Sequence, residues 1–76
     1  MNMPAKLTLK QWRVIKGVSA EELQKKTMIP VSTIYYYEND VKKLRKAKYE
    51  TVLKISEALG ISVDDILLEE TSENPK

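Results

Sequence analysis

The chain has 76 residues, enough for one small domain with a modest core. Cysteine and histidine are both absent, so the sequence offers no disulfide framework, no thiolate metal site and no histidine-based catalytic arrangement. We therefore expect neither an enzyme nor a bound cofactor or metal. No apolar run approaches the ~20 residues of a membrane span, and the N-terminus lacks the apolar stretch of a signal peptide. A cytoplasmic location without membrane contact is the expectation.

Charge is unevenly distributed, although the net charge is only +2. Residues 1–56 contain twelve Lys or Arg against five Asp or Glu, whereas residues 57–76 contain one Lys against six acidic residues. A basic body followed by an acidic tail favours a polyanionic partner for the body.

The first helix is predicted over residues 7–16, after a flexible arm of residues 1–6. Thr8 can cap this helix, and Leu9 and Trp12 share its inner face. Gly17 ends it, as expected of a residue that readily takes a left-handed conformation at a helix C-terminus.

The centre of the chain predicts two short helices joined by a tight turn. Ser19 and Glu22 have the spacing of a capping box, in which each side chain accepts a hydrogen bond from the other residue's backbone N–H. The helix that they begin should run to about Thr27. Pro30 then ends it and suits the first turn of the next helix, which is predicted over residues 31–38.

The second central helix has two unlike sides, because successive residues advance by about 100°. Ile34, Tyr37 and Glu38 share the side that should face the core. The opposite side carries no charge, whereas a solvated helix face normally carries Lys or Glu, so it is a candidate contact surface. This side consists of Val31, Ser32, Tyr35 and Tyr36.

A polar link is predicted over residues 39–47, and it contains a run of cations. The next helix is predicted over residues 48–59, where apolar residues recur at helical spacing. Gly60 ends it in the same way that Gly17 ends the first helix.

The last part of the chain predicts one more short helix and a tail. Ser62 can cap a helix that carries Ile66 and Leu67, and residues 70–76 are predicted to form a disordered acidic tail. No strand alternation, internal repeat or linker is evident. Residues 7–69 are therefore expected to form one all-α domain, a compact bundle of about five short helices.

The joint order of many positions along the chain is more distinctive than any single motif. This order resembles the Cro/repressor-type helix-turn-helix family, the lambda-repressor-like or XRE-type DNA-binding domains of phage repressors and bacterial regulators. The resemblance covers roughly residues 7–68 and implies a bundle around a central helix-turn-helix. It is carried by Leu9, Trp12-Arg13, Gly17-Val18-Ser19, Glu22-Leu23, Val31-Ser32-Thr33-Ile34, Glu38-Asn39, Val52-Leu53-Lys54-Ile55 and Ala58-Leu59-Gly60-Ile61.

Several positions depart from the family pattern. The family usually has Ala where Gln24 stands, Gly where Met28 stands, and Ser or Thr where Pro30 stands. Asp40 also replaces a common Gly. A methionine takes a positive φ only at a cost, because its Cβ crowds the backbone. We therefore expect a turn of slightly different shape, which would change the angle of the helix after it.

The resemblance implies that the second central helix enters the DNA major groove and reads base edges near its N-terminus. Val31, Ser32 and Tyr36 fall where the family reads bases, with Tyr35 beside them. Valine can pack on a thymine methyl group, serine can bond several base edges, and tyrosine can contact a methyl group or a phosphate. The alternative is that the tyrosines are ordinary core or surface aromatics, which is the expected role of Tyr37.

The cations after that helix are the expected phosphate contacts, because the link should flank the groove. They are Lys42, Lys43, Arg45, Lys46 and Lys48. Asn39 matches a family position that touches phosphate, and Thr33 is a weaker candidate. The alternative is a solvated loop that merely aids solubility.

Arg13 and Glu38 resemble a family pair that forms a buried salt bridge between the first and third helices. Such a pair is weak evidence for stability, although removing one partner leaves a charge unpaired. The alternative is two unrelated surface charges.

These features predict a sequence-specific transcriptional regulator, repressor-like and of phage or bacterial type, that binds double-stranded DNA. One short domain reads few base pairs, so a homodimer on a two-fold operator is expected. We expect no small-molecule ligand, since the domain leaves no room for a ligand-sensing unit.

The alternative function is a protein-interaction module on the same scaffold, antitoxin-like or antirepressor-like. A DNA-binding module should bind mixed-sequence DNA at low salt and lose it as salt rises, whereas a protein module should be indifferent to DNA. The interaction surface would combine the acidic residues from Glu57 onward with Ile61, Val63, Ile66, Leu67 and Leu68.

Overall fold

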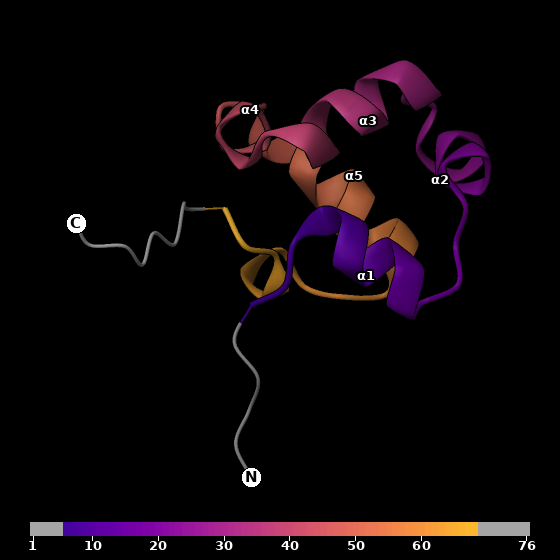
Figure 1. The fold of residues 1–76 in the computed structure, drawn as a ribbon, viewed down its shortest axis with the longest axis horizontal. Coiled ribbons are helices and arrows are strands. Elements are labelled where there is room, and N and C mark those ends of the chain that lie inside the picture. Colours follow the sequence, from indigo (N-terminus) through magenta and orange to yellow (C-terminus); the bar gives the residue numbers. More distant parts are fainter. Residues whose placement is uncertain (1–5, 69–76) are drawn as a thin grey trace, which may run out of the picture.

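The computed structural model describes residues 6–68, which form helices packed around a shared core (Figure 1). In chain order these are α1 (Leu9–Ile15), α2 (Ala20–Thr27), α3 (Val31–Asn39), α4 (Val41–Arg45) and α5 (Tyr49–Leu59), followed by a 3-10 turn over Val63–Asp65. The all-α fold class is confirmed. Within residues 6–68, no helix is long and apolar enough to cross a membrane. The expected arm, apart from Lys6, and the expected tail lie outside the described residues.

The helix ends follow the local signals in the sequence. Thr8 and Gln11, Ser19 and Glu22, and Ser62 and Asp65 each form a reciprocal capping box. Gly17 and Gly60 have φ of 69° and 73°, the left-handed conformation that favours glycine. These interactions span three or four residues, so they depend little on the rest of the fold.

The predicted polar link between α3 and α5 is wrong in one respect, because its middle is helical. Asp40 caps α4, and its Oδ1 accepts a hydrogen bond from the Lys42 N–H at 2.9 Å. Leu44 is buried and packs in the core cluster. A cap and one apolar anchor are enough to hold this short helix among its cations, because the core covers Leu44.

The predicted last helix is also wrong, because only residues 63–65 form a 3-10 turn and the chain beyond them is extended. Ile66 pairs with Leu7 in a parallel bridge, in which the Leu67 N–H donates to the Leu7 carbonyl oxygen at 2.8 Å. Trp12 Nε1 donates to the Asp65 carbonyl oxygen at 2.8 Å and ties this segment to α1. Pairing with a distant segment replaces the helical hydrogen bonds here.

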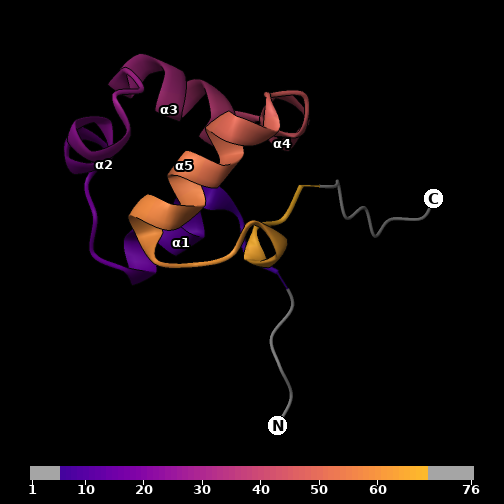
Figure 2. The same cartoon turned by 180° about the vertical axis from the view of Figure 1, so that it is seen from behind.

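Ile66 is fully buried, which corrects its predicted place on a partner-binding surface. In Figure 2, α5 crosses the middle of the bundle, with α1 behind it and α3 above it. The core that surrounds α5 draws on every helix and consists of Leu9, Ala20, Leu23, Ile29, Ile34, Leu44, Val52, Ile55, Leu59 and Ile66.

Candidate nucleic-acid interface

The turn between α2 and α3 contains a methionine in the left-handed conformation. Met28 has φ 67° and ψ 18°, and its N–H donates to the Gln24 carbonyl oxygen at 2.7 Å. Its side chain is 81% exposed, while the next residue, Ile29, is buried. Met28 thus keeps the backbone that a glycine takes readily in such a turn, and it carries the steric cost of its Cβ.

The first backbone N–H of α3 is bonded by a side chain of α2. Pro30 stands at the N-cap and makes no side-chain cap. Instead, Gln24 Oε1 accepts a hydrogen bond from the Val31 N–H at 2.8 Å. A Ser or Thr at the Pro30 position would accept from a different donor, the N–H of Ser32 or Thr33. The Gln24 bond is therefore not a substitute for an N-cap side chain, and it connects α2 directly to the start of α3.

The inner side of α3 is anchored to the core and to α1. Ile34 is fully buried, and Tyr37 packs against the core cluster. Arg13 of α1 contacts Glu38 through two hydrogen bonds, from Nε to Oε2 at 2.6 Å and from Nη2 to Oε1 at 3.1 Å. A third bond runs from Arg13 Nη1 to the Val18 carbonyl oxygen at 3.2 Å.

The Arg13–Glu38 ion pair is largely removed from solvent, since the side chains are 12% and 3% exposed. The hydrogen bond to Glu38 raises the pKa of Arg13, against the opposing effect of burial. The arginine therefore stays charged at any ordinary pH. Its two hydrogen bonds to Glu38 attach the C-terminal part of α3 to α1.

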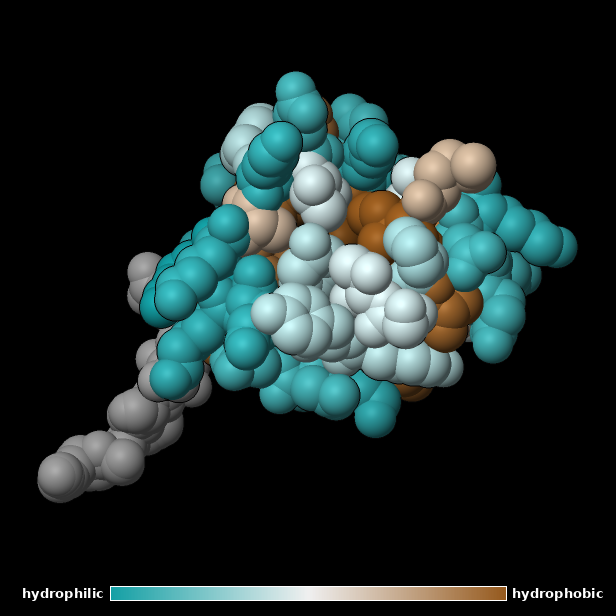
Figure 3. All heavy atoms as spheres, turned by 90° about the horizontal axis from the view of Figure 1, so that it is seen from above, coloured by the Kyte–Doolittle hydropathy of each residue, from teal (hydrophilic) through white to brown (hydrophobic). Residues whose placement is uncertain are grey.

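The outer side of α3 is an uncharged surface. Ser32 is exposed, and Tyr35 and Tyr36 are 44% and 52% exposed. Val31 differs from the prediction, because it is half-buried and packs against the core cluster. Figure 3 looks down on the α2–α3 side of the molecule, where a pale area of intermediate hydropathy lies between hydrophilic residues and some exposed hydrophobic atoms. We call Ser32, Tyr35 and Tyr36 the α3 row.

The predicted phosphate contacts lie on α4 and beside it. Lys42, Arg45 and Lys46 are exposed, whereas Lys43 is half-buried. Lys43 Nζ lies 5.0 Å from the centre of the Tyr36 ring. One cation of the run therefore contacts the α3 row, and Lys42, Arg45 and Lys46 are exposed on α4 and at its C-terminal cap.

The two remaining candidates lie at different places on α3. Asn39 is exposed and is the last residue of the helix, next to the start of α4. Thr33 is half-buried, and its N–H donates to the Pro30 carbonyl oxygen at 3.0 Å. Asn39 thus lies close in sequence to the cations of α4, whereas Thr33 lies in the first turn of α3.

A family model described as helix-turn-helix matches residues 9–66, most of the described chain. The chain belongs to this helix-turn-helix family, of the XRE and lambda-repressor type. The family consists of DNA-binding regulators and is not typically enzymatic, so this helix-turn-helix domain is a DNA-binding module of that type. No curated protein and no solved structure matches the chain.

Two features of the helix-turn-helix domain escaped the sequence analysis. The helix α4 was predicted as a polar link because of its cations, although Asp40 followed by Leu44 has the spacing of a helix cap and a buried apolar residue. The Gln24–Val31 bond was not predicted either. The sequence signal for it is Pro30, which has no side-chain acceptor for the N–H groups at the start of α3. Both features position the α3 row and the cations beside it.

Proposed function

We propose that this helix-turn-helix domain is a sequence-specific, repressor-like transcriptional regulator that reads the major groove of double-stranded DNA with α3. The observation that carries the proposal is the adjacency of two unlike surfaces. The α3 row is exposed and uncharged, and the cations of α4 follow it directly in the chain. The first surface suits base edges, and the second suits the phosphates that flank a groove.

Base recognition by the α3 row would depend on shape and on methyl contacts. Ser32 can donate to or accept from several base edges, which makes it a weak discriminator. The rings of Tyr35 and Tyr36 can pack on thymine methyl groups, and so can the part of Val31 that remains exposed. The row has no Arg, Asn or Gln for bidentate pairing with guanine or adenine, so an A·T-rich operator fits it best.

Phosphate binding is assigned to the exposed cations Lys42, Arg45 and Lys46, with Asn39 beside them and Thr33 in the first turn of α3. Each cation that neutralises a phosphate adds to the salt dependence of binding but conveys no sequence information. The division of roles between α3 and α4 is therefore measurable.

The proposed form on DNA is a homodimer on a two-fold operator, because one α3 reads few base pairs. Ile66 is buried, so the subunit contact is assigned to Leu67 and Leu68, which remain partly exposed. Leu67→Glu should weaken operator binding without changing base preference. Sedimentation that finds a monomer both free and on DNA would contradict the dimer.

The test of the function compares an operator, selected from random duplexes with the purified protein, with a scrambled duplex at several salt concentrations. Lys46→Ala should weaken binding to both duplexes and lower the slope of log affinity against log salt by roughly one. Ser32→Ala and Tyr36→Ala should leave that slope nearly unchanged and lower operator preference by about 1–3 kcal/mol for a contact that matters. Equal loss on both duplexes would refute the assignment of the α3 row.

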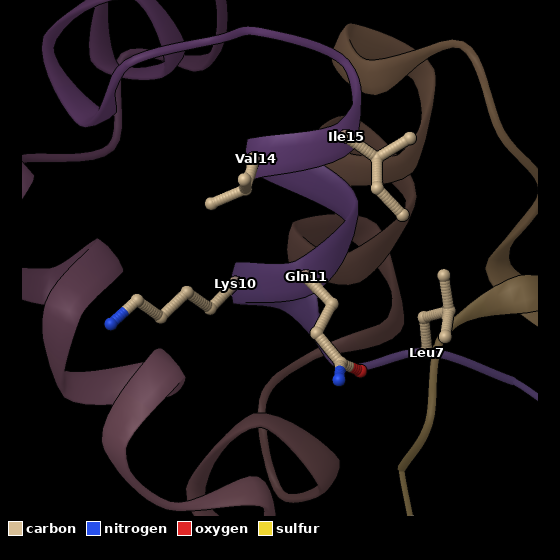
Figure 4. Close-up of a pocket in the computed structure, with 5 residues that line it drawn as sticks. All are labelled: Leu7, Lys10, Gln11, Val14 and Ile15. Atoms are coloured by element: carbon tan, nitrogen blue, oxygen red, sulfur yellow. The ribbon is translucent and has the colours of Figure 1, made fainter.

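A protein-interaction module is the second candidate function, and a feature of α1 favours it. Val14 and Ile15 are 64% and 62% exposed and line a shallow hollow of about 300 Å³. In Figure 4 their side chains project from α1, with Lys10 and Gln11 one turn away and Leu7 on the preceding segment. A protein that shows no salt-dependent binding to any duplex would favour this function over DNA reading.

A further inference from the structure

Tyr36 has neighbours on two sides although it is the most exposed tyrosine of α3. Lys43 Nζ lies 5.0 Å from the centre of its ring. The Tyr37 ring lies 5.8 Å away, centre to centre, and is tilted by 54°. Tyr37 is itself half-buried against the core, so one neighbour of Tyr36 is fixed by the fold.

Lys43 is also held in place by the helix that carries it. The Lys43 N–H donates to the Asp40 carbonyl oxygen at 2.9 Å, and the next residue, Leu44, is anchored in the core. Lys43 is half-buried, whereas Lys42 and Lys46 on either side are exposed. The backbone position of Lys43 is therefore fixed by α4 rather than by a mobile loop, and its ammonium group lies against the Tyr36 ring.

We infer that Lys43 is a positioning residue for base reading, because its ammonium group over the Tyr36 ring holds that ring in the orientation that α3 presents to the groove. The inference rests on the proposed function and assigns Lys43 a role different from the phosphate contact that the sequence predicts. An ammonium group is attracted to the face of an aromatic ring.

A ring that is ordered before binding loses less conformational freedom when it meets its base. In a non-specific complex Tyr36 contacts no matching base, so holding its ring in one orientation adds nothing to the affinity for such DNA. Loss of Lys43 should therefore weaken operator binding more than binding to other sequences. Loss of a cation that contacts only phosphate should weaken both to the same extent.

The experiment measures operator and scrambled-duplex affinity for the full chain, for four single variants and for one double variant. Lys43→Ala should lower the ratio of the two affinities by about 2- to 10-fold, the range expected for one immobilised side chain. Lys46→Ala is the matched control, since it removes the same charge from the end of α4 and should leave the ratio unchanged. Lys43→Arg keeps a cation that can stack on the ring and should preserve the ratio.

The fourth variant, Tyr36→Leu, tests whether Lys43 acts through the ring. With Tyr36→Leu already present, Lys43→Ala should lower the ratio no further, because the group that it positions is gone. If Lys43→Ala lowers the affinity ratio equally in the wild-type and the Tyr36→Leu protein, Lys43 does not act through the ring. If Tyr36→Leu lowers the ratio but Lys43→Ala does not, Lys43 does not position the ring. Either result overturns the positioning role and leaves the proposed DNA reading intact. If the wild-type protein prefers no duplex, the proposed function fails and the positioning role fails with it.

A readout without DNA tests the geometry by itself. The ε-methylene protons of Lys43 should show an upfield ring-current shift in the NMR spectrum of the free protein, and Tyr36→Leu should abolish it. Those of Lys46 serve as the internal reference. Random-coil shifts for Lys43 in the wild-type protein would overturn the inference, whatever the DNA measurements show.

Discussion

The hydrogen bond from the Val31 N–H to Gln24 Oε1 is the most direct target for a test, because within residues 6–68 the Gln24 side chain makes no other hydrogen bond. We predict that Gln24→Ala destabilises the domain. Removing an N-terminal cap of a helix costs about 0.5–2 kcal/mol, typically near 1. Alanine is a better helix former than glutamine by a few tenths of a kcal/mol, which offsets part of that loss in α2. The expected net loss is about 0.5–1 kcal/mol.

The loss of stability in Gln24→Ala should be nearly independent of which residue stands at the N-cap. Pro30 has φ −57° and ψ 147°, close to the φ −77° and ψ 164° of Ser19 at the start of α2, so a serine fits the Pro30 backbone. In Pro30→Ser the new hydroxyl can accept from the Ser32 or Thr33 N–H but not from the Val31 N–H that Gln24 bonds. Gln24→Ala should therefore still cost about 0.5–1 kcal/mol in that background, and the two effects should add within roughly 0.3–0.5 kcal/mol.

Thermal and urea unfolding, followed by circular dichroism, measure both effects. For a domain of this size 1 kcal/mol shifts Tm by about 4–8 °C, so Gln24→Ala should lower Tm by roughly 2–8 °C. Lys25→Ala is the matched control, because it changes a neighbouring exposed position of α2 and should stay within about 0.5 kcal/mol of wild type. A Gln24→Ala variant as stable as Lys25→Ala would show that the glutamine does not cap α3.

Other predictions concern the turn, the ion pair and α4. Met28→Gly should raise stability by about 0.5–1 kcal/mol, because it removes the steric strain of a Cβ in the left-handed conformation and loses part of that gain to the greater entropy of the unfolded chain. A lower Tm for this variant would contradict this account. Arg13→Ala and Glu38→Ala should each cost about 3–5 kcal/mol, since each leaves a buried charge unpaired. Their double mutant should lose clearly less than the sum in chemical unfolding, and strict additivity would mean that the pair does not interact. Leu44→Ala should cost about 2–5 kcal/mol and speed amide exchange in α4, and an unchanged exchange rate would mean that the core does not hold this helix.

Local chemistry in the sequence was sufficient to predict most helix boundaries. The capping pair of Ser19 and Glu22 and the left-handed Gly17 and Gly60 act within one helical turn, so neighbouring residues already determine them. The division of α3 into a buried and an exposed side was predicted from helical periodicity for the same reason. Val31 is the exception, because the burial of a residue at the edge of a helix face depends on what packs against it.

Contacts between distant segments were decided by the tertiary structure alone. Ile66 lies beside Leu7 because the chain returns to α1, and backbone pairing there replaces the helix that the local cap predicts. The bond between Gln24 and Val31 and the contact of Lys43 with the Tyr36 ring likewise require neighbouring helices to be packed first. Side-chain reach and solvent exclusion are properties of that packing, and a one-dimensional pattern of residue types does not contain the distances on which they depend.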